Sequence, residues 1–244
     1  MTTAEIIPFP EAEQRPEERP VLVLDLGGQY AQLIARRVRE CRVYSELVGH
    51  RISAEEARQH NPAALILSGG PASVYADTAP RIDPGLYELG VPVLGICYGA
   101  QLIALDLGGS VERTGTSEFG KTSLHASGGS LFAGLPDEQT VWMSHRDTVT
   151  APPEGGVVTA ESPGTPVAAF EASERGLYGV QFHPEVVHTP HGQEVLKNFL
   201  YGAAKLPPAW TAAAVIEEQV ARIRSTCSPI TAAAVHAGGI AATP

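Results

Sequence analysis

The 244-residue sequence predicts an α/β fold: an open, mostly parallel twisted sheet with helices on both faces, plus a smaller antiparallel β extension. The first observation is a set of short, continuous apolar runs, which are typical of strands covered on both faces. They are VLVLDL (21–26), AALILS (63–68) and VPVLGI (91–96). The second observation is that segments of helical spacing separate these runs, as in a doubly wound sheet. The third is a change of character from about 110 to 182, where short β-rich segments alternate with Pro and Gly.

The helices of the first half are predicted from periodicity and from end signals. Apolar residues recur at helical spacing after the first strand, at Tyr30, Leu33, Ile34, Val38 and Cys41. VYSELV (43–48) then predicts a second strand. Ser53 with Glu56 three residues later resembles a capping box that opens a short helix. A further helix follows Cys97 and stops at Gly108 and Gly109.

The second half is predicted to be antiparallel and then helical. Its β-rich segments include VVTA, VAAF and LYGVQF, which we expect to form antiparallel strands that extend the sheet. GQEVLKNFLYGAA (192–204) predicts a closing helix with one apolar face. That face carries Val195, Leu196, Phe199, Leu200 and Ala203. Pro207 and Pro208 end the pattern.

The chain divides into one globular domain and flanking segments. Residues 1–19 are rich in Glu and Pro and predict a disordered arm. The domain spans 20–205, and 206–225 is predicted to be a linker containing an amphipathic helix at 210–225. The last residues, 226–244, have no clear period and predict a disordered tail.

Composition excludes several classes of partner. The net charge is −10 and no basic stretch is long enough for a phosphate-binding surface, so we expect no nucleic acid. No apolar run is long enough to span a bilayer, and the N-terminus lacks a secretory signal. We therefore expect no membrane contact and a cytoplasmic location. The odd count of three cysteines argues against a disulfide framework.

Cys97 lies in Gly95-Ile96-Cys97-Tyr98-Gly99, directly between a predicted strand and a predicted helix. This arrangement is typical of a nucleophile elbow, where small flanking residues allow a tight turn that exposes the nucleophile. The helix N-terminus behind the sulfur favours the thiolate. The alternative, a buried core cysteine, is the better interpretation for Cys41, which falls on a helix core face, and Cys227 is expected to be inert.

His183 and Glu185 follow another predicted strand, in Gln181-Phe182-His183-Pro184-Glu185. A histidine can take the thiol proton and later give it to a leaving amine, and a nearby carboxylate can hold the imidazole in the right tautomer. Alone, this spacing is weak evidence, because surface histidines beside acids are common. His183, His188 and His191 have irregular spacing, so we expect no metal.

Acyl transfer also needs donors for a tetrahedral oxyanion. The backbone N–H of Tyr98, which follows the nucleophile, is one candidate. The N–H of Gly70 in Leu67-Ser68-Gly69-Gly70-Pro71 is the second, although a glycine pair alone also suits an ordinary turn.

These motifs together resemble the class I glutamine amidotransferases, a family of triad enzymes. GICYGAQ, LSGGP and QFHPE match its pattern, over about 21 to 203. The resemblance implies a flavodoxin-like fold, a γ-glutamyl thioester on Cys97, and ammonia release from glutamine. By the same resemblance, the substrate glutamine is expected to contact Gln101, Ser144, His145, Arg146 and Asp147.

Within this family, the sequence is most similar to the amidotransferase domains of GMP synthases. The segments that carry this similarity are LDLGGQYAQLIARRVRE, SGGPASVY, SEFGK, VWMSH and HPEVVHT. The resemblance implies that the partner is an ATP-pyrophosphatase domain or subunit, and that XMP is aminated to GMP. No Ser-Gly-Gly-x-Asp-Ser phosphate loop is present, so ATP and Mg²⁺ would belong to that other part and no cofactor to this chain. That part lies on a second polypeptide or was lost by truncation, and the loss of pattern after Ser225 favours truncation.

One position departs from the family pattern. Arg146 stands in Ser-His-Arg-Asp, where the family usually has glycine. Arginine there either weakens glutamine binding or points to solvent, and we expect impaired but present activity. Two alternatives stay open: a non-catalytic module damaged at Arg146, and an amidotransferase for another acceptor of the anthranilate or aminodeoxychorismate type. The Tyr-Gly-Ala-Gln after Cys97 speaks against the second.

Overall fold

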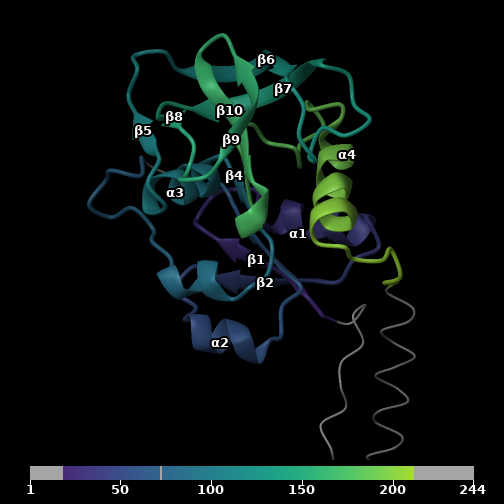
Figure 1. The fold of residues 1–244 in the computed structure, drawn as a ribbon. Helices are drawn as coiled ribbons and strands as arrows, with labels where there is room; N and C mark the ends of the chain where they lie inside the picture. Colours follow the sequence, from purple (N-terminus) through teal and green to yellow (C-terminus); the bar gives the residue numbers. More distant parts are fainter. Residues whose placement is uncertain (1–18, 72, 212–244) are drawn as a thin grey trace, which may run out of the picture. The chain divides into compact units, whose positions relative to one another are not determined.

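The computed structural model describes residues 19–71 and 73–211. Most of the predicted arm (1–19), most of the predicted linker (206–225) and the whole predicted tail (226–244) lie outside the described residues. The described elements belong to one compact unit that ends at Ala209. They form a nine-stranded sheet and a separate two-stranded sheet, with helices packed against the larger one (Figure 1).

The parallel half of the large sheet has the order β2-β1-β3-β4-β11. Its strands are β1 (Val21–Asp25), β2 (Ser45–Gly49), β3 (Ala64–Leu67), β4 (Val93–Ile96) and β11 (Leu177–Val180). All neighbouring pairs within this half are parallel. The apolar runs of β1, β3 and β4 are buried, as the sequence predicts for strands covered on both faces.

Helices cover the two faces of this half. They are α1 (Ala31–Glu40), α2 (Ala54–Gln59), η2 (Pro84–Glu88), α3 (Tyr98–Asp106), α4 (Gly192–Lys197) and the π-helical turn η4 (Asn198–Ala203). The side chains of alternate β1 residues divide the core: Val21 and Val23 share one cluster with α1, α4 and η4, whereas Leu22 and Leu24 share the other with α2, η2 and α3. In Figure 1, α1 and α4 accordingly lie on one side of the strands and α3 on the other.

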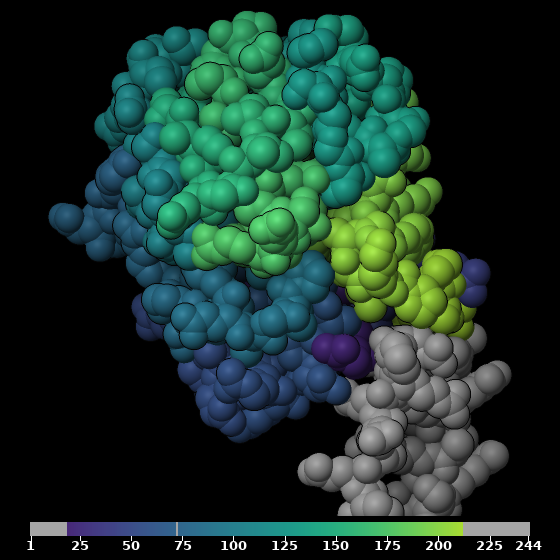
Figure 2. Space-filling model, in the orientation of Figure 1, coloured from purple at the N-terminus to yellow at the C-terminus, as the bar shows by residue number. Residues whose placement is uncertain are grey.

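The antiparallel half continues the sheet in the order β11-β10-β9-β6-β7. Its strands are β6 (Glu118–Ala126), β7 (Glu138–His145), β9 (Val157–Ser162) and β10 (Thr165–Ala172). The short turn η3 (Ser173–Arg175) joins β10 to β11, and the small sheet pairs β5 (Ser110–Glu112) with β8 (Thr148–Ala151). In the space-filling view these segments form the upper part of the visible face (Figure 2).

Two local predictions need correction. LYGVQF was expected to be antiparallel, but β11 pairs parallel with β4 and antiparallel only with β10, so it joins the two halves of the sheet. The closing helix was predicted as one regular apolar-faced helix over 192–204, but it is α-helical only to Lys197 and π-helical from Asn198, where the Ala204 N–H donates to the Phe199 carbonyl. The predicted capping box is confirmed, since the Ser53 side chain and the Glu56 side chain cap each other's backbone N–H groups.

Gly179 in β11 provides a test of this junction. A Cβ at Gly179 would lie 2.2 Å from the ring of Phe170, its buried partner residue on β10. We therefore predict that Gly179→Ala lowers the free energy of unfolding by about 1–3 kcal/mol, because the ring must move in a packed core. Urea denaturation measures this change.

Gly49 is the matched control, because it also lies in a strand but a Cβ there would meet nothing within 4 Å. Gly49→Ala should change the unfolding free energy by less than about 0.5 kcal/mol. Equal effects of the two substitutions would show that the β10–β11 contact is not as tight as described.

Candidate active site

Cys97 sits in the turn between β4 and α3. Its backbone has φ 53° and ψ −105°, a positive-φ conformation that costs a non-glycine residue on the order of 1–3 kcal/mol. The Cys97 N–H donates to the Val180 carbonyl at 2.8 Å, which ties the turn to β11. The flanking glycines are needed, since an added Cβ would lie 2.4 Å from the Leu67 carbonyl oxygen at Gly99 and 2.5 Å from the Ala100 nitrogen at Gly95. The turn therefore has the tight geometry of a nucleophile elbow.

His183 and Glu185 lie just beyond β11, the parallel neighbour of β4. His183 Nδ1 is 2.7 Å from Glu185 Oε1, with both side chains buried. The backbone holds them in place, because the His183 N–H donates to the Trp142 carbonyl and Arg37 Nε donates to the Glu185 carbonyl. The structure thus brings together the predicted Cys, His and Glu, which are up to 88 residues apart in the sequence by their numbers, 185 − 97.

The charge state of His183 depends on its neighbours. Burial lowers the pKa of His183, but the Cys97 charge, a hydrogen bond with Cys97 and the bonded Glu185 carboxylate together outweigh it. The net effect raises the pKa of His183 from its ordinary value of 6.5 to about 11. With Nδ1 bonded to Glu185, Nε2 is the nitrogen left for Cys97. The arrangement favours a charged imidazolium beside the Cys97 sulfur.

A cleft of about 400 Å³ opens beside Cys97. Every residue predicted for the oxyanion site or for substrate binding lines it, namely Gly70, Tyr98, Gln101, Ser144, His145, Arg146 and Asp147. Gly70 packs flat on the Tyr98 ring, since a Cβ at Gly70 would lie 2.6 Å from that ring. The backbone at Gly70 can thereby approach the residue that follows the nucleophile.

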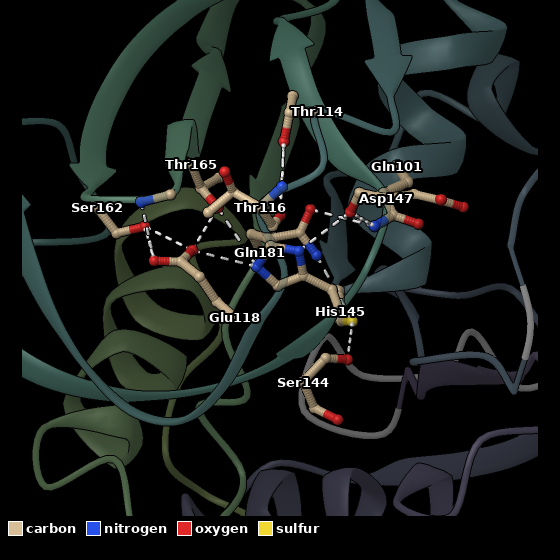
Figure 3. Close-up of polar contacts among 12 residues, drawn as sticks. Gln101, Thr114, Thr116, Glu118, Ser144, His145, Asp147, Ser162, Thr165 and Gln181 are labelled. Carbon is tan, nitrogen blue, oxygen red and sulfur yellow. Dashed lines mark hydrogen bonds and ion pairs between the residues drawn. The ribbon is translucent and has the colours of Figure 1, made fainter.

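Several of these cleft residues form hydrogen bonds with each other (Figure 3). Gln101 Nε2 donates to the Asp147 carbonyl at 2.7 Å, and Asp147 Oδ1 pairs with Arg113 at 3.1 Å. His145 Nδ1 lies 3.1 Å from the Asp147 carbonyl oxygen, and its Nε2 lies 3.4 Å from Glu118 Oε2. Burial lowers the pKa of His145, although Glu118 and the Asp147 carbonyl act in the opposite direction. Both ring nitrogens are therefore engaged with protein groups.

Arg146 is exposed at the cleft and does not take up the backbone conformation that glycine alone favours. Within residues 19–71 and 73–211, the non-glycine residues with positive φ are Arg42, Asn61, Cys97 and Lys205. Arg146 therefore fits this turn without backbone strain, and its effect on glutamine depends on its side chain.

Two polar residues beside the cleft have no role that could be assigned from the sequence. Glu118 is buried and accepts hydrogen bonds from Ser162, Thr165 and the Gly164 N–H, so it anchors the turn between β9 and β10 next to His145. Gln181 is buried, and its Nε2 donates to Cys97 Sγ at 3.6 Å. Both belong to the motifs SEFGK and QFHPE, but only the fold reveals what their side chains contact.

Elsewhere the described residues offer no competing cysteine nucleophile or metal site. Burial raises the pKa of Cys41 to about 11, and Gln193 Nε2 lies 2.8 Å from its sulfur. Cys227 lies outside the described residues. No group of three or more His, Cys, Asp or Glu side chains in the described part could hold a metal ion. None of the helices described there is long and apolar enough to cross a membrane.

Comparison with known proteins matches most of the chain to a family. The model of the family "Glutamine amidotransferase class-I" matches residues 22–203. The chain belongs to the class I glutamine amidotransferase family. It is 60% identical over 207 residues to a "GMP synthase [glutamine-hydrolyzing]" of Mycobacterium bovis, covering 85% of this chain and 39% of the relative. It is 55% identical over 234 residues to the protein of that name from Streptomyces avermitilis, covering 95% of this chain and 45% of the relative.

A solved structure supports the amidotransferase fold. It is the crystal structure of a protein from Thermoplasma acidophilum that is described as a GMP synthase subunit. The TM-score is 0.67 at 32% identity, and the match covers 83% of this chain and 98% of the other. By contrast, the chain spans only 39% and 45% of the length of the two curated relatives.

The pKa of His183 gives a direct test of the site's electrostatics. We predict that the His183 ring resonances of the wild-type protein do not titrate between about pH 6 and 8, because the folded pKa lies above that range. In Cys97→Ala the pKa should fall toward 6.5 or below, since removing the Cys97 charge leaves burial less opposed. Two-dimensional NMR of labelled histidines measures both.

His125, which is exposed and pairs with Glu138 across β6 and β7, serves as the internal control. Its ring resonances should not be changed by the Cys97→Ala substitution. A His183 resonance that titrates identically with and without Cys97 would contradict a charged Cys–His pair.

Proposed function

We propose that this domain hydrolyses glutamine to glutamate and ammonia through a γ-glutamyl thioester on Cys97. The observation that carries this proposal is the contact between Cys97, which lines the cleft from its strained turn, and His183, which lies 2.7 Å from Glu185. A thiolate, a proton carrier and an orienting carboxylate are the groups that acyl transfer from an amide requires.

In the first half-reaction, the Cys97 thiolate attacks the side-chain carbonyl carbon of glutamine. The tetrahedral intermediate collapses when its C–N bond breaks, and His183 gives its Nε2 proton to the departing nitrogen, which leaves as ammonia. Glu185 keeps the proton on Nδ1 by accepting its hydrogen bond, and so fixes the imidazole orientation. In the second half-reaction, His183 takes a proton from water, the hydroxide attacks the thioester, and glutamate leaves as Cys97 is regenerated.

The oxyanion formed in both steps needs preorganised donors. We assign them to the backbone N–H groups of Tyr98 and Gly70. Support comes from their place on the cleft wall and from the close packing of Gly70 on the Tyr98 ring. Tyr98 is also the first residue of α3, so its N–H points out of a helix N-terminus, where negative charge is favoured.

We propose GMP synthesis as the use of the ammonia. The two curated relatives bear the name of a glutamine-hydrolysing GMP synthase, and this chain matches only 39% and 45% of their length. Under this proposal the partner is an ATP-pyrophosphatase domain or subunit that binds ATP, Mg²⁺ and XMP. The amidotransferase chemistry itself uses only side chains of this chain. A free nucleophilic thiol also suits a reducing compartment, which supports the cytoplasmic location expected from the sequence.

Of the other candidates, the inactive module is the one that a specific observation addresses. That candidate depends on damage to the glutamine pocket at Arg146. Arg146 has no positive φ, so the backbone gives the candidate no support and the damage would have to come from the arginine side chain. The other alternative, delivery of ammonia to an acceptor of the anthranilate or aminodeoxychorismate type, is not favoured, because the two relatives bear the name GMP synthase.

The roles of Cys97, His183 and Glu185 predict how strongly each substitution lowers glutaminase activity. Cys97→Ala should abolish glutamine hydrolysis, because no other group at the cleft can form the thioester. His183→Ala should lower kcat by about 10²–10⁴-fold. Glu185→Ala should lower kcat by no more than His183→Ala does, because Glu185 orients the His183 ring and does not carry the proton. Glutamate release, followed with glutamate dehydrogenase, measures all three.

Cys41→Ala is the matched control, since Cys41 is a buried cysteine that packs with α1 and contacts Gln193 rather than the cleft. It should retain wild-type activity. Residual activity in Cys97→Ala, or a clearly larger loss in Glu185→Ala than in His183→Ala, would refute the assigned roles.

Amidotransferases of this kind avoid wasting ammonia by hydrolysing glutamine slowly until their synthetase part is loaded. We therefore predict weak basal glutaminase activity for this chain. A separately produced ATP-pyrophosphatase domain of a GMP synthase should raise it in the presence of ATP, Mg²⁺ and XMP. Arg146→Gly should lower the KM for glutamine if the arginine side chain crowds the cleft.

The control for coupling omits XMP, and the rate should then stay at its basal level. High activity without any partner would contradict coupling. No activity even in Arg146→Gly with the loaded partner would instead support the inactive module.

A further inference from the structure

Gln181 lies immediately after β11, beside the turn that carries Cys97. Its side chain is 1% exposed, and its Nε2 is 3.6 Å from Cys97 Sγ. This distance is within the range of an N–H···S hydrogen bond, which is longer than one to oxygen. Gln181 thus brings a side-chain amide into contact with the reacting sulfur.

The nitrogen and oxygen of a glutamine side chain can be exchanged by rotating the amide by 180°. Which atom faces the sulfur therefore has to be deduced from a neighbouring group that can only donate or only accept. The Asp147 carbonyl is such a group, because a backbone oxygen only accepts. Gln101 Nε2 lies 2.7 Å from it and must be the nitrogen end of that side chain. The same NH₂ lies 3.2 Å from Gln181 Oε1, so the oxygen end of Gln181 faces Gln101. The nitrogen end of Gln181 is then the one that faces Cys97.

Besides His183 and Gln181, the sulfur has a third polar neighbour, and that one is an acceptor. The Ser144 carbonyl oxygen lies 3.8 Å from Cys97 Sγ, so it can accept a proton from a thiol but repels a thiolate. An N–H directed at the sulfur counters that repulsion. Such a bond to a charged acceptor is stronger than one between neutral groups.

We propose that Gln181 is a further catalytic residue, whose amide N–H holds the Cys97 sulfur in its anionic form and in the direction of attack. This inference rests on the proposed glutaminase function and deepens it. Gln101 acts here as a positioning residue that keeps the donating end of Gln181 toward the sulfur. No proton is transferred through the amide; it donates one hydrogen bond to the thiolate before attack and again when the thioester is hydrolysed.

The support for Gln101 extends deeper into the domain. The same Asp147 carbonyl lies 3.1 Å from His145 Nδ1, and the opposite side of that ring faces Glu118. Glu118 is held by two hydroxyl groups and one N–H from the β9–β10 turn. The direction of the Gln181 amide is therefore fixed by a continuous set of contacts that reaches from the nucleophile to the antiparallel half of the sheet.

The test is the rate at which iodoacetamide alkylates Cys97 in the full chain at about pH 7, followed by mass spectrometry of the Cys97 peptide. In Gln181→Met, which keeps the length but removes the donor, the rate should fall by about tenfold or more. Gln181→Glu should fall at least as far, because a carboxylate oxygen then faces the sulfur. Gln101→Met should cause a smaller fall, since it only releases the Gln181 amide to turn.

Gln139→Met is the matched control: Gln139 is also buried and donates from Nε2 to a carbonyl, that of Pro136, but does not line the cleft. It should be alkylated at the wild-type rate. Circular dichroism identifies any variant that fails to fold, and Gln101→Met then carries the test. Wild-type rates in the folded Gln181 or Gln101 variants, or an equal loss in Gln139→Met, would overturn the proposal.

Alkylation requires no glutamine, so this experiment separates the two claims. A wild-type protein without glutaminase activity, in which Gln181→Met still slows alkylation, would refute the proposed function and support the role of Gln181. Wild-type protein that hydrolyses glutamine, together with wild-type alkylation rates in Gln181→Met and Gln101→Met, would support the proposed function and refute the role of Gln181.

Discussion

The site depends on one strained turn, in which Cys97 leaves β4 and starts α3 with a positive φ. A turn this tight brings the backbone of α3 against β3, which is why a Cβ at Gly99 would strike the Leu67 carbonyl. It also leaves the sulfur at the carboxyl edge of the parallel strands, where ligands bind in open α/β sheets. The strain is held by packing on both faces of the sheet and by the bond from the Cys97 N–H to Val180.

The second constraint is that β11 runs parallel to β4, with Val180 opposite Ile96. Residues that follow these strands therefore emerge at the same edge, so Gln181 and His183 lie beside Cys97 although they are far from it in sequence. Thr189 secures this arrangement, because its hydroxyl donates to the His183 carbonyl and accepts from the Trp142 N–H. The antiparallel half of the sheet thus contributes to the site by fixing the histidine backbone and the 144–147 segment.

The parallel strands, the tight turn at Cys97 and the positions of Cys97, His183 and Glu185 could be predicted from the sequence, because each depends on local information: continuous apolar runs, flanking glycines and a short motif. The pairing of β11 could not, because whether a strand pairs parallel or antiparallel depends on neighbours about 80 residues away, 177 − 96, and not on its own residues. The contacts of Glu118 and Gln181 could not be predicted from the sequence for the same reason, since each side chain forms hydrogen bonds with groups that only the folded sheet brings near. Nothing in the pattern at 192–204 indicated the π-helical turn.

The central claim is that Cys97 carries the γ-glutamyl group during turnover. The most direct measurement is rapid acid quenching of the protein with radiolabelled glutamine, followed by peptide mapping and hydroxylamine treatment. The account predicts label on the Cys97 peptide, its release by hydroxylamine as glutamyl hydroxamate, and none on the Cys41 peptide. Glutamine hydrolysis at a measurable rate with no label on Cys97 at any quench time, under conditions that preserve thioesters, would contradict it.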